Sequence, residues 1–254
     1  FSKIVKEGSR VFLHRFGQPA STDRLVFGDG YDPTWFTSCG VSRDGRWLTC
    51  RASRGSTGDD AEIFVAGVTG GGQLKPIVKG MKARFSGGVG GDRLFLLTDW
   101  NAPNGRVLSI DLRHPERENW KEIIPESGDA ILNTELLGGH IVVERMVNVK
   151  TAITLYTPEG NRVREIPVPG FGSLSGLDGD WRTDDAFYSF DSLAQPETIY
   201  HYSVATGKQT VWEKLKIPVS NAPVELKQVW YNSKDGTRVP MFVAHRKGLK
   251  LDGG

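Results

Sequence analysis

The sequence predicts an all-β fold built from a repeated unit of four short strands. Apolar runs bounded by turn residues recur along the 254 residues, and the 31 glycines and 13 prolines are spread out, as many short strands joined by turns require. No segment combines a sustained helical period with capping signals. A repeat of ~40–50 residues with four strands is typical of a β-propeller blade, so we expect about four to five antiparallel blades.

The expected strands fall into two tiers. The first tier contains apolar runs between turns, over Arg10–His14, Leu25–Phe27, Trp47–Cys50, Ile63–Val65, Leu94–Leu97, Val107–Ile110, Ile141–Glu144, Ile153–Tyr156, Phe187–Phe190 and Thr198–Tyr202. The second tier closes each unit, over Leu74–Val78, Trp120–Ile124, Val163–Val168 and Thr210–Glu213. Together they predict four full units, over Trp35–Lys79, Ala83–Ile124, Ala130–Val168 and Leu174–Lys214.

The tail has a different pattern from the blades. Two strand-like runs, Gln228–Tyr231 and Val239–Ala244, flank Asp235-Gly236, which is a strong hairpin signal. We therefore divide the chain into blades over residues 1–222 and a hairpin with a linker over residues 223–254.

The two cysteines, Cys39 and Cys50, lie on either side of a turn centred on Asp44-Gly45. A two-residue turn would place them directly opposite each other, whereas a three-residue turn with a left-handed Gly45 would offset them by one. We favour the three-residue turn, and free thiols over a disulfide, because two cysteines form no disulfide framework. The cysteines leave the compartment open.

Composition excludes several classes of function. A net charge of +2 argues against a nucleic-acid-binding protein, which would carry a clustered basic face. No apolar run reaches the roughly eighteen residues of a membrane span. The chain starts at Phe1 without a leader, so we expect that any targeting segment was removed or never present. We expect a cytoplasmic location, with a periplasmic or secreted one as the alternative.

No catalytic or metal site is evident in the sequence. The nearest approach to the hydrolase nucleophile motif Gly-x-Ser-x-Gly is Gly172–Gly176, which has Leu174 at the centre and is interpreted as an inter-blade loop. The five histidines form no metal-ligand pair, and we expect neither a metal nor a cofactor. Acidic pairs such as Asp59-Asp60 could in principle serve a propeller glycosidase, but no pattern of residues indicates one.

Several segments, in a shared order, resemble the propeller of prolyl oligopeptidases. They are Phe12–Gly17, Asp32–Phe36, Val41–Arg46, Trp120–Glu126 and Phe187–Tyr200. The tail, with Ser233–Thr237 and Val239–Phe242, resembles the entry to the α/β-hydrolase domain that carries the catalytic serine in this family. Since the family's propeller has seven blades, the resemblance implies that this chain holds part of it and that the catalytic domain lies elsewhere.

The resemblance implies the propeller portion of a serine endopeptidase that cleaves short peptides after proline. The propeller would gate access to the active site, and this chain would be inactive by itself. A stand-alone propeller that binds peptides or proteins is the alternative. The hydrolase domain and proline-containing oligopeptides are the implied partners.

One loop, Arg51–Asp59, is the candidate substrate-lining segment. In the family, the matching loop faces the catalytic domain and lines the pocket for the residue before proline. Arg54 would hold a peptide carbonyl or pair with Asp59. Ser56 falls where some members have a cysteine, so no thiol-sensitive subsite is expected. An exposed polar loop without contact to substrate would fit the same residues.

The two ends of the chain pose a closure problem. The stretch Arg10–Phe27 supplies the last two strands of a blade and leaves an open edge. We hypothesise that the C-terminal hairpin pairs with it and closes a five-bladed ring. Association of two copies through their open faces, or missing blades supplied by another chain, are the competing outcomes.

Overall fold

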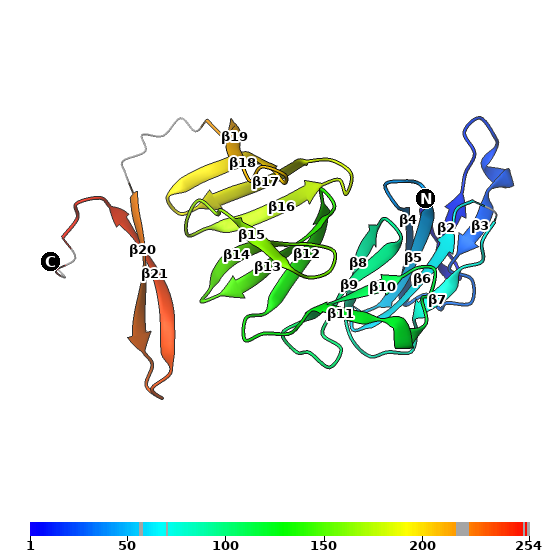
Figure 1. Cartoon of the computed structure of the whole chain (residues 1–254), viewed down its shortest axis with the longest axis horizontal. Coiled ribbons are helices and arrows are strands. Elements are labelled where there is room, and N and C mark those ends of the chain that lie inside the picture. Colours follow the sequence, from blue (N-terminus) through cyan, green and yellow to red (C-terminus); the bar gives the residue numbers. More distant parts are fainter. Residues whose placement is uncertain (56–57, 70, 217–223, 251, 253–254) are drawn as a thin grey trace. The chain divides into compact units, whose positions relative to one another are not determined.

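The computed structural model describes residues 1–55, 58–69, 71–216, 224–250 and 252. Within these residues the chain forms six β-sheets and two three-residue 3-10 helices, Ala20–Thr22 and Arg117–Asn119 (Figure 1). In the described part no helix is long and apolar enough to span a membrane. The all-β prediction is confirmed.

In every sheet the strands follow one another in chain order. The first sheet contains β1 (Ser2–Val5), β2 (Gly8–Leu13) and β3 (Arg24–Phe27). The second contains β4 (Trp35–Val41), β5 (Trp47–Arg54), β6 (Asp60–Gly67) and β7 (Lys75–Val78), and the third β8 (Phe85–Gly90), β9 (Arg93–Thr98), β10 (Arg106–Asp111) and β11 (Lys121–Ile124).

The fourth sheet contains β12 (Ile131–Leu137), β13 (His140–Val147), β14 (Lys150–Tyr156) and β15 (Arg162–Ile166). The fifth contains β16 (Ser173–Gly179), β17 (Asp185–Ser192), β18 (Gln195–Ser203) and β19 (Gln209–Lys214). These four-stranded sheets match the four predicted units. The last sheet is the C-terminal hairpin of β20 (Val224–Asn232) and β21 (Arg238–Arg246).

The same irregularity recurs where the last two strands of each blade pair. The residue pair that precedes the register shift is Ile63 with Val78, Val107 with Ile124, Leu155 with Arg164, and Ile199 with Glu213. The β2–β3 pair shifts in the same way after Val11 and Phe27. The first sheet therefore corresponds to the last three strands of a blade, rather than the last two that the sequence predicted, because Ser2–Val5 adds a strand.

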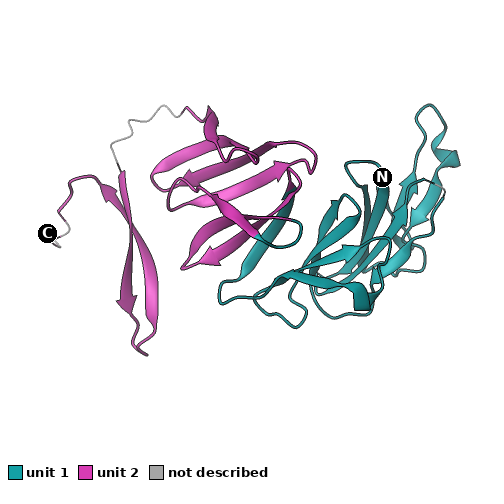
Figure 2. Cartoon of the chain, viewed as in Figure 1, with its two compact units in different colours: residues 1–136, 158–161 teal, residues 137–157, 162–254 magenta. Residues whose placement is uncertain are grey.

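The chain divides into two compact units, residues 1–136 with 158–161, and residues 137–157 with 162–254 (Figure 2). In the first unit, β6 contributes to two cores. Ile63 and Val65 pack with Leu94 and Leu96 of β9, whereas Phe64 packs with Val11 on the other side. Because successive side chains of a strand point to opposite faces, one strand joins two interfaces between sheets.

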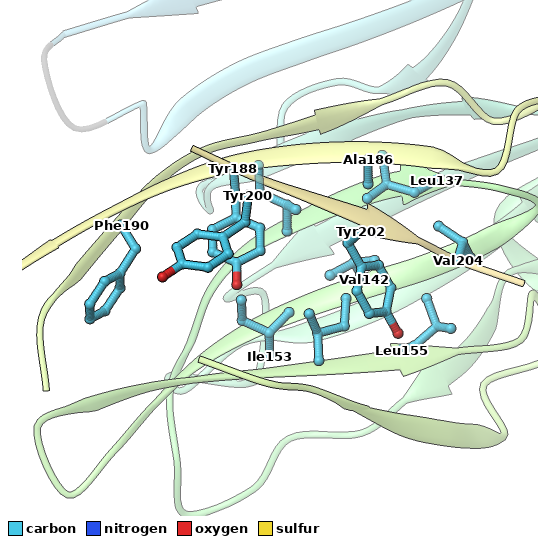
Figure 3. Close-up of a cluster of buried hydrophobic side chains, with 12 residues drawn as sticks. Leu137, Val142, Ile153, Leu155, Ala186, Tyr188, Phe190, Tyr200, Tyr202 and Val204 are labelled. Atoms are coloured by element: carbon cyan, nitrogen blue, oxygen red, sulfur yellow. The ribbon is translucent and has the colours of Figure 1, made fainter. Parts of the chain in front are cut away.

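The core of the second unit lies between strands of the fourth and fifth sheets. Tyr188, Tyr200 and Tyr202 pack among aliphatic side chains such as Ile153 and Leu155 (Figure 3). The rings of Tyr188 and Tyr200 are stacked, with their centroids 5.2 Å apart. Tyr188 donates its hydroxyl proton to the carbonyl of Pro167 or to the side chain of Gln209, both within 3.1 Å of its oxygen.

Alternating strand residues must face neighbouring blades, so the sequence predicts that eight residues are mainly buried between the units: Trp35, Trp47, Leu94, Phe95, Ile141, Val142, Phe187 and Tyr188. Leu94, Phe95, Ile141, Val142 and Tyr188 are buried. The remaining three predicted positions are only partly buried: Trp35, Trp47 and Phe187.

Two hairpins use the same turn. In both Ser42–Arg46 and Ser233–Thr237, the serine hydroxyl and the backbone N–H of the fifth residue contact the aspartate carboxylate. The fourth residue, Gly45 or Gly236, has a φ of +75° or +84°, which favours glycine. These hydrogen bonds lower the pKa of Asp44 to about 2, and the one from the serine hydroxyl has the largest effect.

The cysteine prediction was wrong. The N–H of Ser42 donates to the carbonyl of Trp47, so the loop between the strands has four residues rather than three. An even loop keeps Cys39 directly opposite Cys50, and the two form a disulfide. The predicted left-handed Gly45 is correct, but the longer loop removes the predicted offset.

One premise of the ring-closure hypothesis was wrong, while closure itself stays a prediction. In the hairpin, β20 and β21 pair with each other over nine positions. The hypothesis assumed that two N-terminal strands needed two more. Since β2 already has β1 on its other side, the N-terminal sheet has three strands without the hairpin.

Leu94→Ala tests the packing between the second and third sheets. Leu94 has no exposed surface, so the substitution should leave a cavity and lower the free energy of unfolding by about 2–5 kcal/mol in urea denaturation. Leu193→Ala is the control, because Leu193 is 72% exposed and should change stability by no more than about 0.5 kcal/mol. Equal midpoints for the two variants would contradict this packing.

The Cys39–Cys50 bond gives a second prediction. Without reductant, iodoacetamide should leave the mass of the denatured chain unchanged, and after reduction it should add two carbamidomethyl groups. Replacing both residues by Ala should lower the free energy of unfolding by about 2–4 kcal/mol, because the unfolded chain regains loop entropy. Two adducts without reductant would show that the thiols are free.

Candidate functional site

The predicted substrate-lining loop is the connection between β5 and β6. Strand β5 ends at Arg54 and β6 begins at Asp60, so residues 55–59 link them. The predicted site residue Ser56 lies outside the described residues. Arg54 is described, and its surroundings define the candidate site.

Arg54 is held on two sides by neighbours in the sheet. The backbone pairs place Trp35 of β4 on one side of it and Asp60 of β6 on the other. Its Nη2 lies 2.6 Å from Oδ2 of Asp60, and its guanidinium lies over the Trp35 ring at 5.3 Å from the centroid. The partner of Arg54 is therefore Asp60 and not the predicted Asp59, because Asp60 is its direct cross-strand neighbour.

Asp59 instead faces the third sheet. Its Oδ1 lies 4.0 Å from Nε of Arg84, which also pairs with Asp99 at 2.7 Å. The hydrogen bond to Asp99, followed by the attraction of its charge, raises the pKa of Arg84. Arg84 precedes β8 and Asp99 follows β9, so these charges connect loops at one end of two neighbouring blades.

A tyrosine–carboxylate pair adjoins Arg54 and was not predicted from the sequence. The hydroxyl of Tyr31 donates to Glu62, which lies on the same face of β6 as Asp60. The ring of Tyr31 packs against that of Trp35, with 5.1 Å between centroids. Burial is the main cause that raises the pKa of the Tyr31 phenol, and the hydrogen bond to Glu62 is the second. The pair joins residues 31 apart, a separation that carries no local sequence signal.

Alternating acid, base and aromatic groups thus line one end of the second sheet. Arg54 offers hydrogen-bond donors, while Trp35 and Tyr31 offer aromatic surface. This combination suits a peptide, whose carbonyls accept hydrogen bonds and whose side chains pack on rings.

The segment Gly172–Gly176 is not a nucleophile elbow. It was predicted to be a loop, but Ser173–Gly179 forms β16, the first strand of the fifth sheet. The hydroxyls of Ser175 and Ser189 lie 2.8 Å apart across β16 and β17, so Ser175 serves strand pairing. No group of three metal-ligating side chains occurs among the residues described.

The profile of the N-terminal β-propeller domain of prolyl oligopeptidase matches residues 3–215. The chain belongs to this family. It is 32% identical over 246 residues to the prolyl endopeptidase of Elizabethkingia meningoseptica and 33% identical over 249 residues to that of Elizabethkingia miricola. Each alignment covers 96% of this chain and 34% of the relative.

Solved structures agree with the family assignment. A prolyl endopeptidase from a study of inter-domain dynamics in catalysis and specificity is 36% identical, with a TM-score of 0.83 over 96% of this chain and 36% of that one. Prolyl oligopeptidase B from Galerina marginata, bound to a 35-residue hydrolysis and macrocyclization substrate, is 25% identical with a TM-score of 0.80, over 97% of this chain and 36% of that one. The chain spans about a third of the length of these relatives.

The raised pKa of Tyr31 predicts a pH-dependent stability. The unfolded chain loses this phenolic proton near pH 10, whereas the folded chain keeps it to higher pH. The contribution to stability is therefore complete below pH 10 and is lost as the pH rises towards the folded pKa. In urea denaturation, the free energy of unfolding should fall less between pH 8 and pH 11 for Tyr31→Phe than for the unmodified chain.

Tyr231→Phe is the control for this prediction, because Tyr231 is half-exposed and lies in the hairpin. It should reproduce the pH profile of the unmodified chain. Superimposable profiles for all three proteins would contradict the Tyr31–Glu62 hydrogen bond.

Proposed function

We propose that this chain is the propeller part of a serine endopeptidase that cleaves short peptides after proline. The observation that carries the proposal is that two prolyl endopeptidases align with 96% of the chain. The 254 residues contain no Gly-x-Ser-x-Gly motif, so the nucleophile comes from a separate α/β-hydrolase domain. Residues 223–254, with the hairpin β20–β21, lead into that domain.

In this proposal the propeller acts by steric selection. The sheets expose their loop ends to the catalytic domain, and a flexible oligopeptide passes between the two domains whereas a folded protein is too wide. The rigid sheets make this selection effective, because their cores fix the positions of the loops.

Arg54 lines the path of the substrate. Asp60 and Trp35 hold the guanidinium of Arg54 in place, so little side-chain entropy is lost when it binds a ligand. A guanidinium has five N–H donors, and the contact with Asp60 leaves others for a peptide carbonyl.

The disulfide supports a location outside the cytoplasm. Disulfides persist in the periplasm and outside the cell and are rare in the reducing cytoplasm. The bond between Cys39 and Cys50 therefore favours the periplasmic or secreted alternative over the cytoplasmic one.

Arg54→Ala tests the function in the peptidase that carries this chain together with a catalytic domain. The intact protein should hydrolyse a chromogenic peptide at proline and lose this activity with a serine-directed reagent. In the variant, KM should rise roughly tenfold with kcat nearly unchanged, as the loss of one hydrogen bond from a charged group predicts. The 254-residue chain alone should give no turnover.

Arg46→Ala is the matched control, because Arg46 also pairs with an aspartate, Asp44, but at the other end of β5. It should leave KM unchanged. Equal effects of the two substitutions would argue against a substrate contact at Arg54. An intact protein without turnover that still binds proline peptides would favour the alternative, a peptide-binding propeller.

A further inference from the structure

A cavity of about 390 Å³ lies in the third sheet. Its lining comes from the β9–β10 loop, strands β10 and β11, and the segment before β11. The lining residues are Trp100, Asn101, Arg106, Leu108, Arg117, Trp120 and Glu122. We call it the Trp100 cavity.

The Trp100 cavity combines apolar walls with two guanidinium groups. The guanidinium carbons of Arg106 and Arg117 lie over the Trp100 ring, at 5.0 and 4.3 Å from its centroid. Trp120 meets Trp100 edge to face at 6.5 Å, and its indole N–H is already used by the carbonyl of Pro115. The indole ring of Trp120 therefore offers the cavity mainly apolar surface.

The two arginines differ in how their charge is balanced. Nη1 of Arg106 donates to Glu122 at 2.8 Å. In the described part of the chain, no carboxylate lies within 4.0 Å of the Arg117 guanidinium, which is exposed. The charged lining groups, two arginines and one glutamate, sum to +1.

One donor in the cavity wall has no partner. The side chain of Arg106 is only 17% exposed, and its Nε is buried without a hydrogen-bond acceptor among the described residues. A buried donor without an acceptor is unfavourable, but its burial keeps this nitrogen from direct contact with a ligand in the cavity.

We propose that the Trp100 cavity binds a carboxylate monoanion attached to an apolar group, such as the C-terminal carboxylate of a short peptide. A guanidinium over an aromatic ring keeps its N–H edge available, and that edge matches the two oxygens of a carboxylate. Trp100, Trp120 and Leu108 contact the apolar group. The lining charge of +1 favours a monoanion, because Glu122 repels the second charge of a phosphate dianion.

Isothermal titration calorimetry with the 254-residue chain tests this site. N-acetyl-leucine should bind, whereas its neutral amide should bind at least tenfold more weakly, and inorganic phosphate should also bind more weakly than the carboxylate. A tripeptide ending in leucine, compared with its C-terminal amide, shows whether the site takes a peptide terminus or only a free acid. Equal binding of acid and amide, or no binding of either, would overturn the proposal.

Three variants locate the binding. Arg117→Ala should weaken N-acetyl-leucine binding at least tenfold, while Glu122→Gln should tighten it several-fold, because the lining charge rises from +1 to +2. Lys121→Ala removes the same charge as Arg117→Ala from an exposed position on β11 that lines a different cavity, and it should change little.

Opposite effects of Arg117→Ala and Glu122→Gln separate a local site from a change in folding, and unfolding midpoints check that each variant is folded. Equal weakening by Arg117→Ala and Lys121→Ala would show general charge attraction and overturn the site.

Discussion

The need to bury both faces of an internal blade determines most of this structure. In the third sheet, Leu94, Phe95 and Leu96 are consecutive and all buried, although their side chains alternate between the two faces. A sheet with one solvated face would instead alternate apolar and polar residues. The fifth sheet comes closer to that pattern: along β17, Ala186 and Tyr188 are buried and Phe187 between them is only partly so.

A register shift between the last two strands recurs in every blade. A bulge adds local twist, and here it occurs between the last two strands, after a buried pair such as Val107 with Ile124. Apolar pairs occupy this position in the first three sheets. In the fourth and fifth sheets the shift follows an apolar residue opposite a charged one, Leu155 with Arg164 and Ile199 with Glu213. The repeat is thus one of backbone geometry as well as of sequence.

The sequence predicted the later strands of each blade better than the first. The apolar runs correspond to second and third strands, whereas first strands such as β8 have little apolar pattern. Gly87 of β8 shows why, since a Cβ there would lie 1.9 Å from the carbonyl oxygen of Phe95. Glycine is required by the close approach of the backbones, and it carries no hydrophobic signal. The disulfide was missed because the exact length of the turn after Val41 decides whether the cysteines oppose each other, and the sequence pattern fits more than one length.

The sequence predicted which loop contains the candidate site but not the contacts of its residues. Arg54 follows from the order of the chain, but its contacts with Trp35 and Asp60 depend on the registers of β4 and β6. Those registers are fixed by the buried positions further along the same strands, such as Ala52 and Phe64. The core therefore sets the distances between the polar groups at the strand ends. Substitutions in the loop can change the chemistry of this end of the blade while the core keeps its geometry.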